Sequence, residues 1–180
     1  NMKQQKTNNW YVLTGGPSTG KTTLLKLLSE KGYQVVPEAA RSVIDTHLAD
    51  GITVEELRSD EKHFQELVVQ RKADIESTLD PNAIIFFDRG MHDSNAYLRY
   101  YDFHIEDWID DLVYNATYRK VFLLDQLDRY KDDYARVEDQ AFRERIGELL
   151  QAAYEQSDIP VEVVPDIGLE KRLNHILNSI

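Results

Sequence analysis

The sequence contains no cysteine among its 180 residues. Structural disulfides and a cysteine-ligated zinc site are therefore excluded, and nothing points to an oxidising compartment. No apolar run approaches the roughly 18 residues of a membrane span, and no basic segment followed by an apolar one resembles a signal peptide. We expect a cytoplasmic protein with no membrane partner. Asn1 precedes Met2, and we interpret it as a remnant of an expression tag.

Basic residues are fewer than acidic ones. The chain has 21 Lys and Arg against 32 Asp and Glu, which gives a formal net charge of −11 at pH 7. Binding to a nucleic-acid polymer requires a basic footprint, so we do not expect such a partner. A small anionic ligand remains compatible with this charge, because a few N–H groups and cations can hold it locally.

The histidines lack the spacing of a metal site, since none is paired at i,i+4 or as His-x-His. We interpret them as surface or packing residues. They are His47, His63, His92, His104 and His175. Apolar residues make up 42% of the chain and charged residues 29%, which is ordinary for a folded protein. We expect a single domain over residues 2–180.

Short apolar runs alternate with longer stretches of helical periodicity. The short runs are rich in β-branched and aromatic residues, which is typical of buried strands. The expected strands are Trp10–Leu13, Tyr33–Val36, Ala83–Phe87, Lys120–Leu124 and Val161–Val164. The expected helices are Thr22–Lys31, Val54–Leu79, Asp107–Asn115, Glu138–Glu155 and Leu169–Leu177. This alternation predicts an α/β fold, a three-layer sandwich with a parallel sheet between helices. The stretch Met91–Tyr118 as a whole has no clean period.

The stretch GGPSTGKT fits the pattern G-x-x-x-x-G-K-[ST]. An expected strand precedes it and an expected helix follows, as the pattern requires in a phosphate-binding loop. Glycines let backbone N–H groups turn toward a phosphate where a Cβ would block the approach. A glycine-rich turn before a threonine helix start is the alternative. We predict that the loop binds a nucleotide through Gly15, Gly16, Pro17, Ser18, Thr19, Gly20, Lys21, Thr22 and Thr23.

The residues at the end of this loop have separate expected roles. Lys21 would bridge the β- and γ-phosphates, and the Thr22 hydroxyl would bind Mg²⁺. Thr23 is a further donor to the α-phosphate. The start of the helix adds unpaired N–H groups and the positive end of its dipole.

An aspartate follows the third expected strand, in AIIFFDRG. A phosphate-binding loop requires a carboxylate at the end of a neighbouring strand to hold the metal ion, usually through water. Asp88 is suited to this role. The alternative is an ordinary aspartate that caps the next helix.

A glutamate follows the second expected strand, in VVPEAAR. Pro37 ends the strand, and Glu38 begins a helix at the carboxyl edge of the sheet, where ligands of open α/β sheets bind. Glu38 could accept the proton of a substrate hydroxyl, and Arg41, one turn later, could steady Glu38 or a substrate anion. The alternative is a favourable acidic first turn with a surface ion pair.

A basic segment follows the fourth strand, and we predict a lid over residues 125–139. Mobile arginine-bearing segments shield phosphoryl transfer from water in small-molecule kinases. Arg136 is our candidate for contacting the γ-phosphate. A solvated helix of alternating charge is the alternative, and it is our interpretation of Arg143 and Arg145.

The order of these motifs resembles the AAA-like P-loop ATPase/kinase family. That family is related to bacterial ribosylnicotinamide kinase and, more distantly, to deoxynucleoside and thymidylate kinases. The resemblance covers about residues 11–177. The motifs that carry it are the GGPSTGKTTL loop, VVPEAAR, FFDRGMHDSNAY and FLLDQLDRYKDDYARVED.

This resemblance implies a five-stranded parallel sheet of order 2-3-1-4-5, with ATP as phosphoryl donor and Mg²⁺ as cofactor. It implies an adenine pocket near Val164–Gly168, which includes Pro165. Arg136 matches the lid arginine of the family. The other matching residues are Lys21 and Thr22 in the loop, Glu38, and Asp88 and Arg89 of the D/E-R motif. Besides these, we expect Arg129 to contact the nucleotide and Arg41 and Asp93 to contact the substrate. Gly90 departs from the family pattern, because deoxynucleoside kinases usually carry serine there.

Three functions are consistent with these motifs. The leading prediction is a kinase that transfers the γ-phosphoryl group of Mg-ATP to a hydroxyl or phosphate of a small nucleoside- or nucleotide-like acceptor. The second is a regulatory ATPase, or NTP switch, that acts on a protein partner. The third is a nucleotide-binding module without catalysis. The sequence does not determine the acceptor or the oligomeric state.

Overall fold

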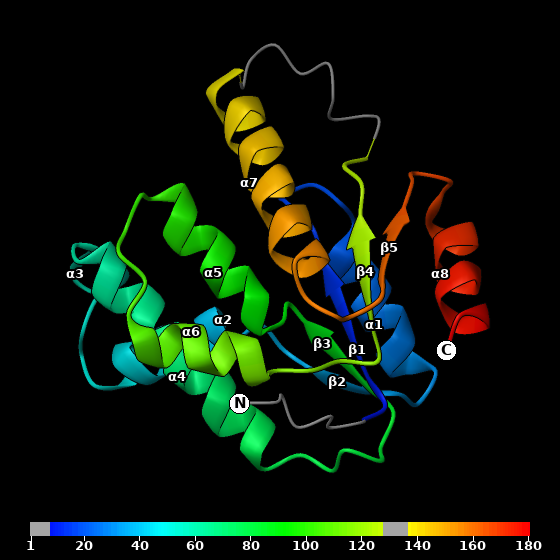
Figure 1. Ribbon diagram of the computed structural model, residues 1–180, viewed down its shortest axis with the longest axis horizontal. Coiled ribbons are helices and arrows are strands. Elements are labelled where there is room, and N and C mark those ends of the chain that lie inside the picture. The colour runs from blue at the N-terminus through cyan, green and yellow to red at the C-terminus, as the bar shows by residue number, and fades with distance from the viewer. Residues whose placement is uncertain (1–7, 128–136) are drawn as a thin grey trace.

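The computed structural model describes residues 8–127 and 137–180, with the side chains of residues 137–139 excepted. A five-stranded parallel sheet of order β2-β3-β1-β4-β5 forms its centre (Figure 1). This is the predicted order 2-3-1-4-5, which is confirmed. The strands are β1 (Trp10–Thr14), β2 (Gln34–Val36), β3 (Ile85–Asp88), β4 (Lys120–Leu124) and β5 (Val161–Val164).

Helices cover both faces of the sheet. They are α1 (Lys21–Glu30), α2 (Ala39–Ala49), α3 (Val54–Arg58), α4 (Glu61–Ser77), α5 (Met91–Tyr100), α6 (Asp107–Asn115), α7 (Val137–Glu155) and α8 (Leu169–Asn178). Successive residues of a strand point to opposite faces. Tyr11 and Leu13 of β1 pack with α1 and α8, whereas Trp10 and Val12 pack with α4, α5, α6 and α7. The predicted three-layer sandwich is therefore confirmed.

The predicted helix over Val54–Leu79 is divided in two. The Thr53 side chain accepts a hydrogen bond from Glu56 N at 3.1 Å and caps α3. The Asp60 side chain accepts one from His63 N at 3.1 Å and caps α4. Asp60 therefore marks the start of a second helix. The N–H groups of a first turn are free to bond to a capping side chain, whereas those inside a continuous helix are not.

Helix α5 lies in the stretch where the sequence shows no clean apolar period. Its buried residues include His92, Asp93, Ser94 and Asn95 beside its apolar ones. Polar side chains at buried positions remove the apolar periodicity on which a helix prediction depends. The partners of these side chains come from other elements of the fold.

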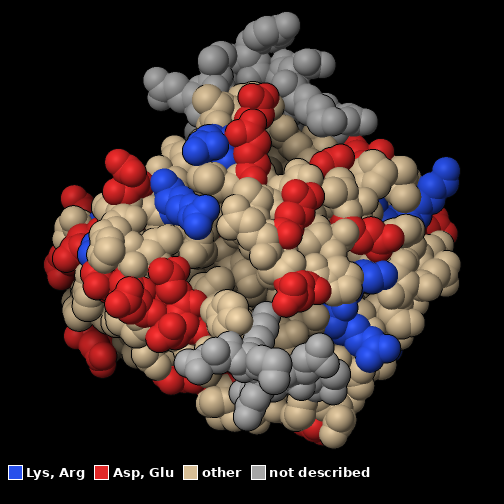
Figure 2. Space-filling view, in the orientation of Figure 1, with Lys and Arg blue, Asp and Glu red and all other residues tan. Residues whose placement is uncertain are grey.

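The charge of the surface agrees with the composition. On the face drawn in Figure 2, acidic side chains are spread widely, and the described Lys and Arg side chains form no continuous patch. Among the residues that the structure describes, no helix is both long and apolar enough to cross a membrane.

Candidate active site

The phosphate loop connects β1 to α1, and its shape depends on positive φ angles. Gly15, Ser18 and Gly20 have φ angles of 148°, 66° and 79°. A Cβ on Gly15 would lie 2.7 Å from the backbone oxygen of Leu124, so the loop packs too closely against β4 for a side chain there. The glycines of the motif therefore have a direct steric explanation, and the loop keeps the cradle that a phosphate requires.

Lys21 and Asp88 meet at the edge of the sheet. Leu13 of β1 is in register with Asp88 of β3, so the end of β3 lies beside the loop that follows β1. Lys21 Nζ forms an ion pair with Asp88 Oδ1, and the lysine is 8% exposed. Thr22 and Thr23 are exposed on the first turn of α1. The structure thus brings together the cation and the carboxylate that the sequence assigned to phosphate and metal.

Arg172 of α8 holds the far side of the phosphate loop. It is 1% exposed, and its guanidinium donates to backbone oxygens of three connections. These acceptors are Thr19 in the phosphate loop, Asp125 after β4 at 2.7 Å, and Val164 and Pro165 after β5 at 3.2 and 2.9 Å. One buried cation therefore joins the phosphate loop to the segment expected to contain the adenine pocket. No sequence pattern had singled out Arg172.

The turn Asp88–Gly90 connects β3 to α5. Arg89 has a φ angle of 71°. Gly90 N donates to Asp93 Oδ1 at 2.9 Å and to the Tyr154 hydroxyl at 3.1 Å. Asp93 also accepts hydrogen bonds from the Thr14 hydroxyl and the Tyr154 hydroxyl. Asp93 therefore connects the turn to β1 and α7. It also lines a cavity that is described below.

Gly90 has no room for a side chain. A Cβ there would lie 2.6 Å from the Tyr154 hydroxyl and 3.0 Å from Val12 Cγ2. Its φ angle of −112° is ordinary, so the restriction is steric. This contact accounts for the departure from the serine of deoxynucleoside kinases.

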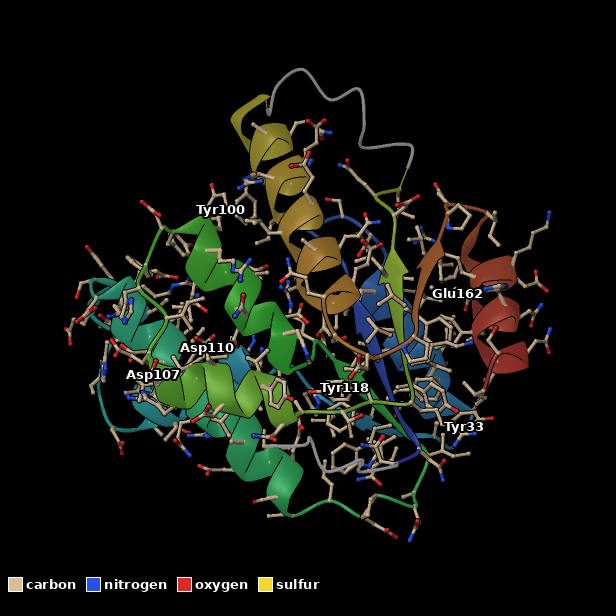
Figure 3. All side chains as sticks on the ribbon, viewed as in Figure 1. Tyr33, Tyr100, Asp107, Asp110, Tyr118 and Glu162 are labelled. Atoms are coloured by element: carbon tan, nitrogen blue, oxygen red, sulfur yellow. The ribbon has the colours of Figure 1, made fainter. Side chains whose placement is uncertain are left out.

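A second buried network supports the same turn. Lys72 Nζ donates to Gly90 O at 2.9 Å and to Ser94 Oγ at 2.8 Å. The Tyr118 hydroxyl accepts from Met91 N at 2.8 Å and donates to Glu76 Oε2 at 2.7 Å. Figure 3 labels Tyr118 in the segment between α6 and β4.

Burial changes the ionisation of this network. It lowers the pKa of Lys72 to about 8 and raises the pKa of Glu76 to about 7. Burial also raises the pKa of the Tyr118 and Tyr154 hydroxyls, which act as neutral donors. The sequence analysis missed these four residues, because charged positions on a helix and isolated tyrosines carry no local pattern.

A cavity of about 150 Å³ lies beside the Asp88–Gly90 turn. Glu38, the N-cap residue of α2, lines it, and Arg89 Nε lies 3.5 Å from Glu38 Oε1. The Arg89 Nη1 group donates to the Tyr97 hydroxyl. Burial opposes the charge of Arg89, but Tyr97, Asp93 and Glu38 outweigh it and raise the pKa of the guanidinium.

The other walls of this cavity come from α3 and α4. The Arg58 guanidinium lies 4.5 Å from the centre of the Phe64 ring, and both residues line the cavity. Gln65 and Lys72 also line it, whereas Arg41, which is exposed on α2, is not among its lining residues. Of the predicted substrate-side residues, the structure brings together Glu38, Arg89 and Asp93. We name this space the acceptor cavity.

Arg143 and Arg145 of α7 differ in solvent exposure. Arg145 is exposed, as expected, and Arg145 Nη1 lies 3.5 Å from Glu148 Oε2. Arg143 is 8% exposed and lines a cavity of about 250 Å³ beside the phosphate loop. Our interpretation of Arg143 as part of a solvated face was therefore wrong, because Gly15, Gly16 and β4 cover its side of the helix. Arg129, Arg136 and most of the predicted lid lie outside the described residues.

The sheet order, the phosphate loop and the strand-end carboxylate define a P-loop nucleotide-binding fold of the nucleoside- and nucleotide-kinase type. A family profile described as an AAA domain matches residues 10–172. The chain belongs to this family. No curated protein sequence matches it significantly.

Solved structures with this fold include kinases of small molecules. The NadR protein in complex with NR has a TM-score of 0.70 at 20% identity, over 96% of this chain and 50% of the NadR chain. Thymidylate kinase from Ehrlichia chaffeensis has a TM-score of 0.62 at 17% identity, over 97% and 98% of the two chains. Deoxyadenosine kinase from M. mycoides has a TM-score of 0.62 at 16% identity, over 94% and 97%. At these identities the likeness establishes the fold.

Proposed function

We propose that this protein is a kinase that transfers the γ-phosphoryl group of Mg-ATP to a small nucleoside- or nucleotide-like acceptor. The acceptor cavity carries the proposal. Its volume of about 150 Å³ is in the range that encloses a single six-membered ring. Arg89 lines it and follows Asp88 directly, so the same turn contributes to the cavity and to the Lys21–Asp88 pair. A ring-sized recess lined by charged and aromatic side chains favours a small-molecule acceptor over a protein surface.

Glu38 and Arg89 would act on the acceptor. Glu38 would accept the proton of the acceptor hydroxyl. The oxygen of that hydroxyl would form the new bond to the γ-phosphorus, while the bond between the γ-phosphorus and the ADP oxygen breaks. Arg89, held by Tyr97 and close to Glu38, would orient the acceptor. For an acceptor that is itself a phosphate, Arg89 and Arg58 would supply the positive charge.

The residues at the loop fit ATP and Mg²⁺. The positive φ angles and the absent Cβ of Gly15 leave backbone N–H groups for the phosphates. Lys21 would exchange its ion pair with Asp88 for the β- and γ-phosphates, and Asp88 and Thr22 would then hold Mg²⁺. When bound, the metal ion would neutralise negative charge on the phosphate oxygens. Arg129, Arg136 and Pro165 remain predicted nucleotide contacts.

The direct test is ADP release from ATP against a panel of nucleosides and nucleotides. One acceptor class should raise the rate far above the basal hydrolysis rate. Glu38→Gln should lower the stimulated rate by about 10²-fold or more, because the proton acceptor is lost. Glu55→Gln, on the exposed first turn of α3, is the matched control and should leave it unchanged.

Two results would contradict the proposal. A basal rate with every acceptor, together with stimulation by a protein partner, would identify a regulatory ATPase. Unchanged turnover in both Glu38→Gln and Asp88→Asn would identify a nucleotide-binding module without catalysis.

A further inference from the structure

Arg143 of α7 is buried, and no carboxylate among the described residues forms an ion pair with it. It is 8% exposed, and its Nε atom is fully buried and has no hydrogen-bond partner. Within the described part of the chain, its guanidinium takes part in no hydrogen bond or ion pair. Arg172, the other strongly buried guanidinium next to the loop, donates to four backbone oxygens. The contrast shows that Arg143 is not used to hold the fold together in the same way.

An arginine in this state destabilises the ligand-free protein. Its Nε atom has lost the water that would solvate it, and no described residue supplies a hydrogen bond in return. A buried positive charge of this kind is compensated when an anion binds to it.

The position of Arg143 identifies where such an anion would be. Arg143 lines the cavity of about 250 Å³ together with Gly15, Gly16, Pro17 and Thr19 of the phosphate loop. Its backbone oxygen lies 3.3 Å from the position that a Cβ on Gly16 would take, so α7 packs directly on the loop. In Figure 1, α7 runs over the sheet on the side opposite α1 and α8.

The acidic residues described at this cavity form no direct ion pair with Arg143. Asp125 and Glu144 also line the cavity, but neither forms an ion pair with Arg143. Glu144 instead accepts a hydrogen bond from the Gln140 amide at 3.0 Å. A ligand that carries several phosphate oxygens would meet an available fork of N–H donors.

We infer that Arg143 is a phosphate-binding residue that contacts a terminal phosphate of the bound nucleotide from α7. The inference rests on the nucleotide-binding part of the proposed function and not on the acceptor. In the absence of nucleotide, the Arg143 guanidinium forms no ion pair with the described residues, and a bound phosphate would supply its counter-charge. Arg143 thus lowers the stability of the ligand-free protein and raises its affinity for phosphate.

The experiment compares Arg143→Met with Arg145→Met, the exposed arginine on the same helix. Isothermal titration with ATP, ADP, adenosine and pyrophosphate measures Kd for each variant and for the unaltered protein. Arg143→Met should weaken ATP binding at least tenfold, which corresponds to about 1.4 kcal/mol. It should leave adenosine binding unchanged. A loss for ATP alone identifies the γ-phosphate, and equal losses for ATP, ADP and pyrophosphate identify the β-phosphate.

Thermal unfolding separates phosphate binding from a structural role. If Arg143 only stabilised the fold, its replacement would lower the Tm of the ligand-free protein. Arg143→Met should raise the Tm of the ligand-free protein, because it removes a buried unpaired charge and keeps most of the side-chain volume. It should also reduce the rise in Tm that ATP produces. Arg145→Met should do neither.

The inference is overturned if Arg143→Met lowers the Tm of the ligand-free protein or prevents folding. It is also overturned if the affinity for ATP and ADP changes less than twofold, or if adenosine binding weakens equally. Absence of phosphoryl transfer to every acceptor would refute the kinase proposal and leave these binding results valid.

Discussion

The phosphate loop and the Asp88–Gly90 turn lie side by side at one edge of the sheet, yet they are built differently. The loop takes its shape from backbone angles at Gly15, Ser18 and Gly20. The turn takes its shape from side chains of β1, α4, α5, α7 and the segment before β4. A local motif therefore specifies the loop, whereas distant residues assemble the turn.

The two regions also differ in charge. A single guanidinium, Arg172, joins the loop to its neighbours through neutral carbonyl oxygens. Ionisable groups with shifted pKa values, Lys72 and Glu76, support the turn. We therefore expect mutations at the loop to act on nucleotide chemistry, and mutations around the turn to act on stability and its pH dependence.

Lys21→Met tests the chemistry of the loop and should have the largest effect. It removes the cation expected on the β- and γ-phosphates, so turnover should fall by roughly 10²- to 10³-fold. Steady-state ADP release measures the loss. Lys26→Met, an exposed position on the same helix, is the control. Retention of more than half of the activity would show that Lys21 is not at the phosphates.

Arg172→Met tests how the loop is held. The variant leaves four backbone oxygens without their buried donor, and the free energy of unfolding should fall by about 3 kcal/mol. Urea denaturation measures the change. Lys171→Met, the exposed neighbour on α8, should stay within about 0.5 kcal/mol of the unaltered protein. Equal effects at the two positions would refute the anchoring role.

Gly90→Ala tests the close packing of the turn. The new Cβ would meet the Tyr154 hydroxyl, so we expect a destabilisation of about 2 kcal/mol. Tyr154→Phe removes that hydroxyl, and the double variant should be less destabilised than the sum of the single variants. Gly147→Ala on α7 is the control, because nothing lies within 4 Å of its added Cβ. Strict additivity in denaturation experiments would rule out the contact.

Glu76→Gln tests the ionisation of the network under the turn. Burial raises the pKa of Glu76 to about 7 in the folded state, above its value of about 4.3 in the unfolded chain. The folded protein therefore holds a proton that the unfolded chain lacks. The resulting stability is complete below about pH 4.3 and is lost as the pH rises through 7.

Between pH 6 and 7.5 the unaltered protein should lose roughly 1 kcal/mol of unfolding free energy through this group. Glu76→Gln should lose less, since an amide does not titrate. Denaturant titrations at both pH values measure the difference. Glu148→Gln, on the exposed side of α7, should retain the full pH dependence. If both variants behave alike, Glu76 is not the titrating group.

The sequence alone predicted the fold and the sheet order, and the structure confirms both. Strand–helix alternation gave the layers, and the resemblance gave the order of the strands. The predicted strand Lys120–Leu124 has the observed bounds, and Trp10–Leu13 is one residue short. Helix α5 was not predicted, because a helix that buries His92 to Asn95 has no apolar period. Lys72, Tyr118, Tyr154 and Arg172 were missed for a related reason, since their partners lie far away along the chain.

The sequence by itself determined the phosphate loop, because the glycines of that motif allow the positive φ angles that shape it within a few residues. Only the tertiary structure decided which cations and carboxylates are buried, since burial depends on what packs over each side chain. Arg143 and Arg145 stand two residues apart on one helix. One is enclosed beside the phosphate loop and the other is exposed. No local pattern distinguishes them, because the residues around Arg143 come from the phosphate loop and from β4, which lie outside α7.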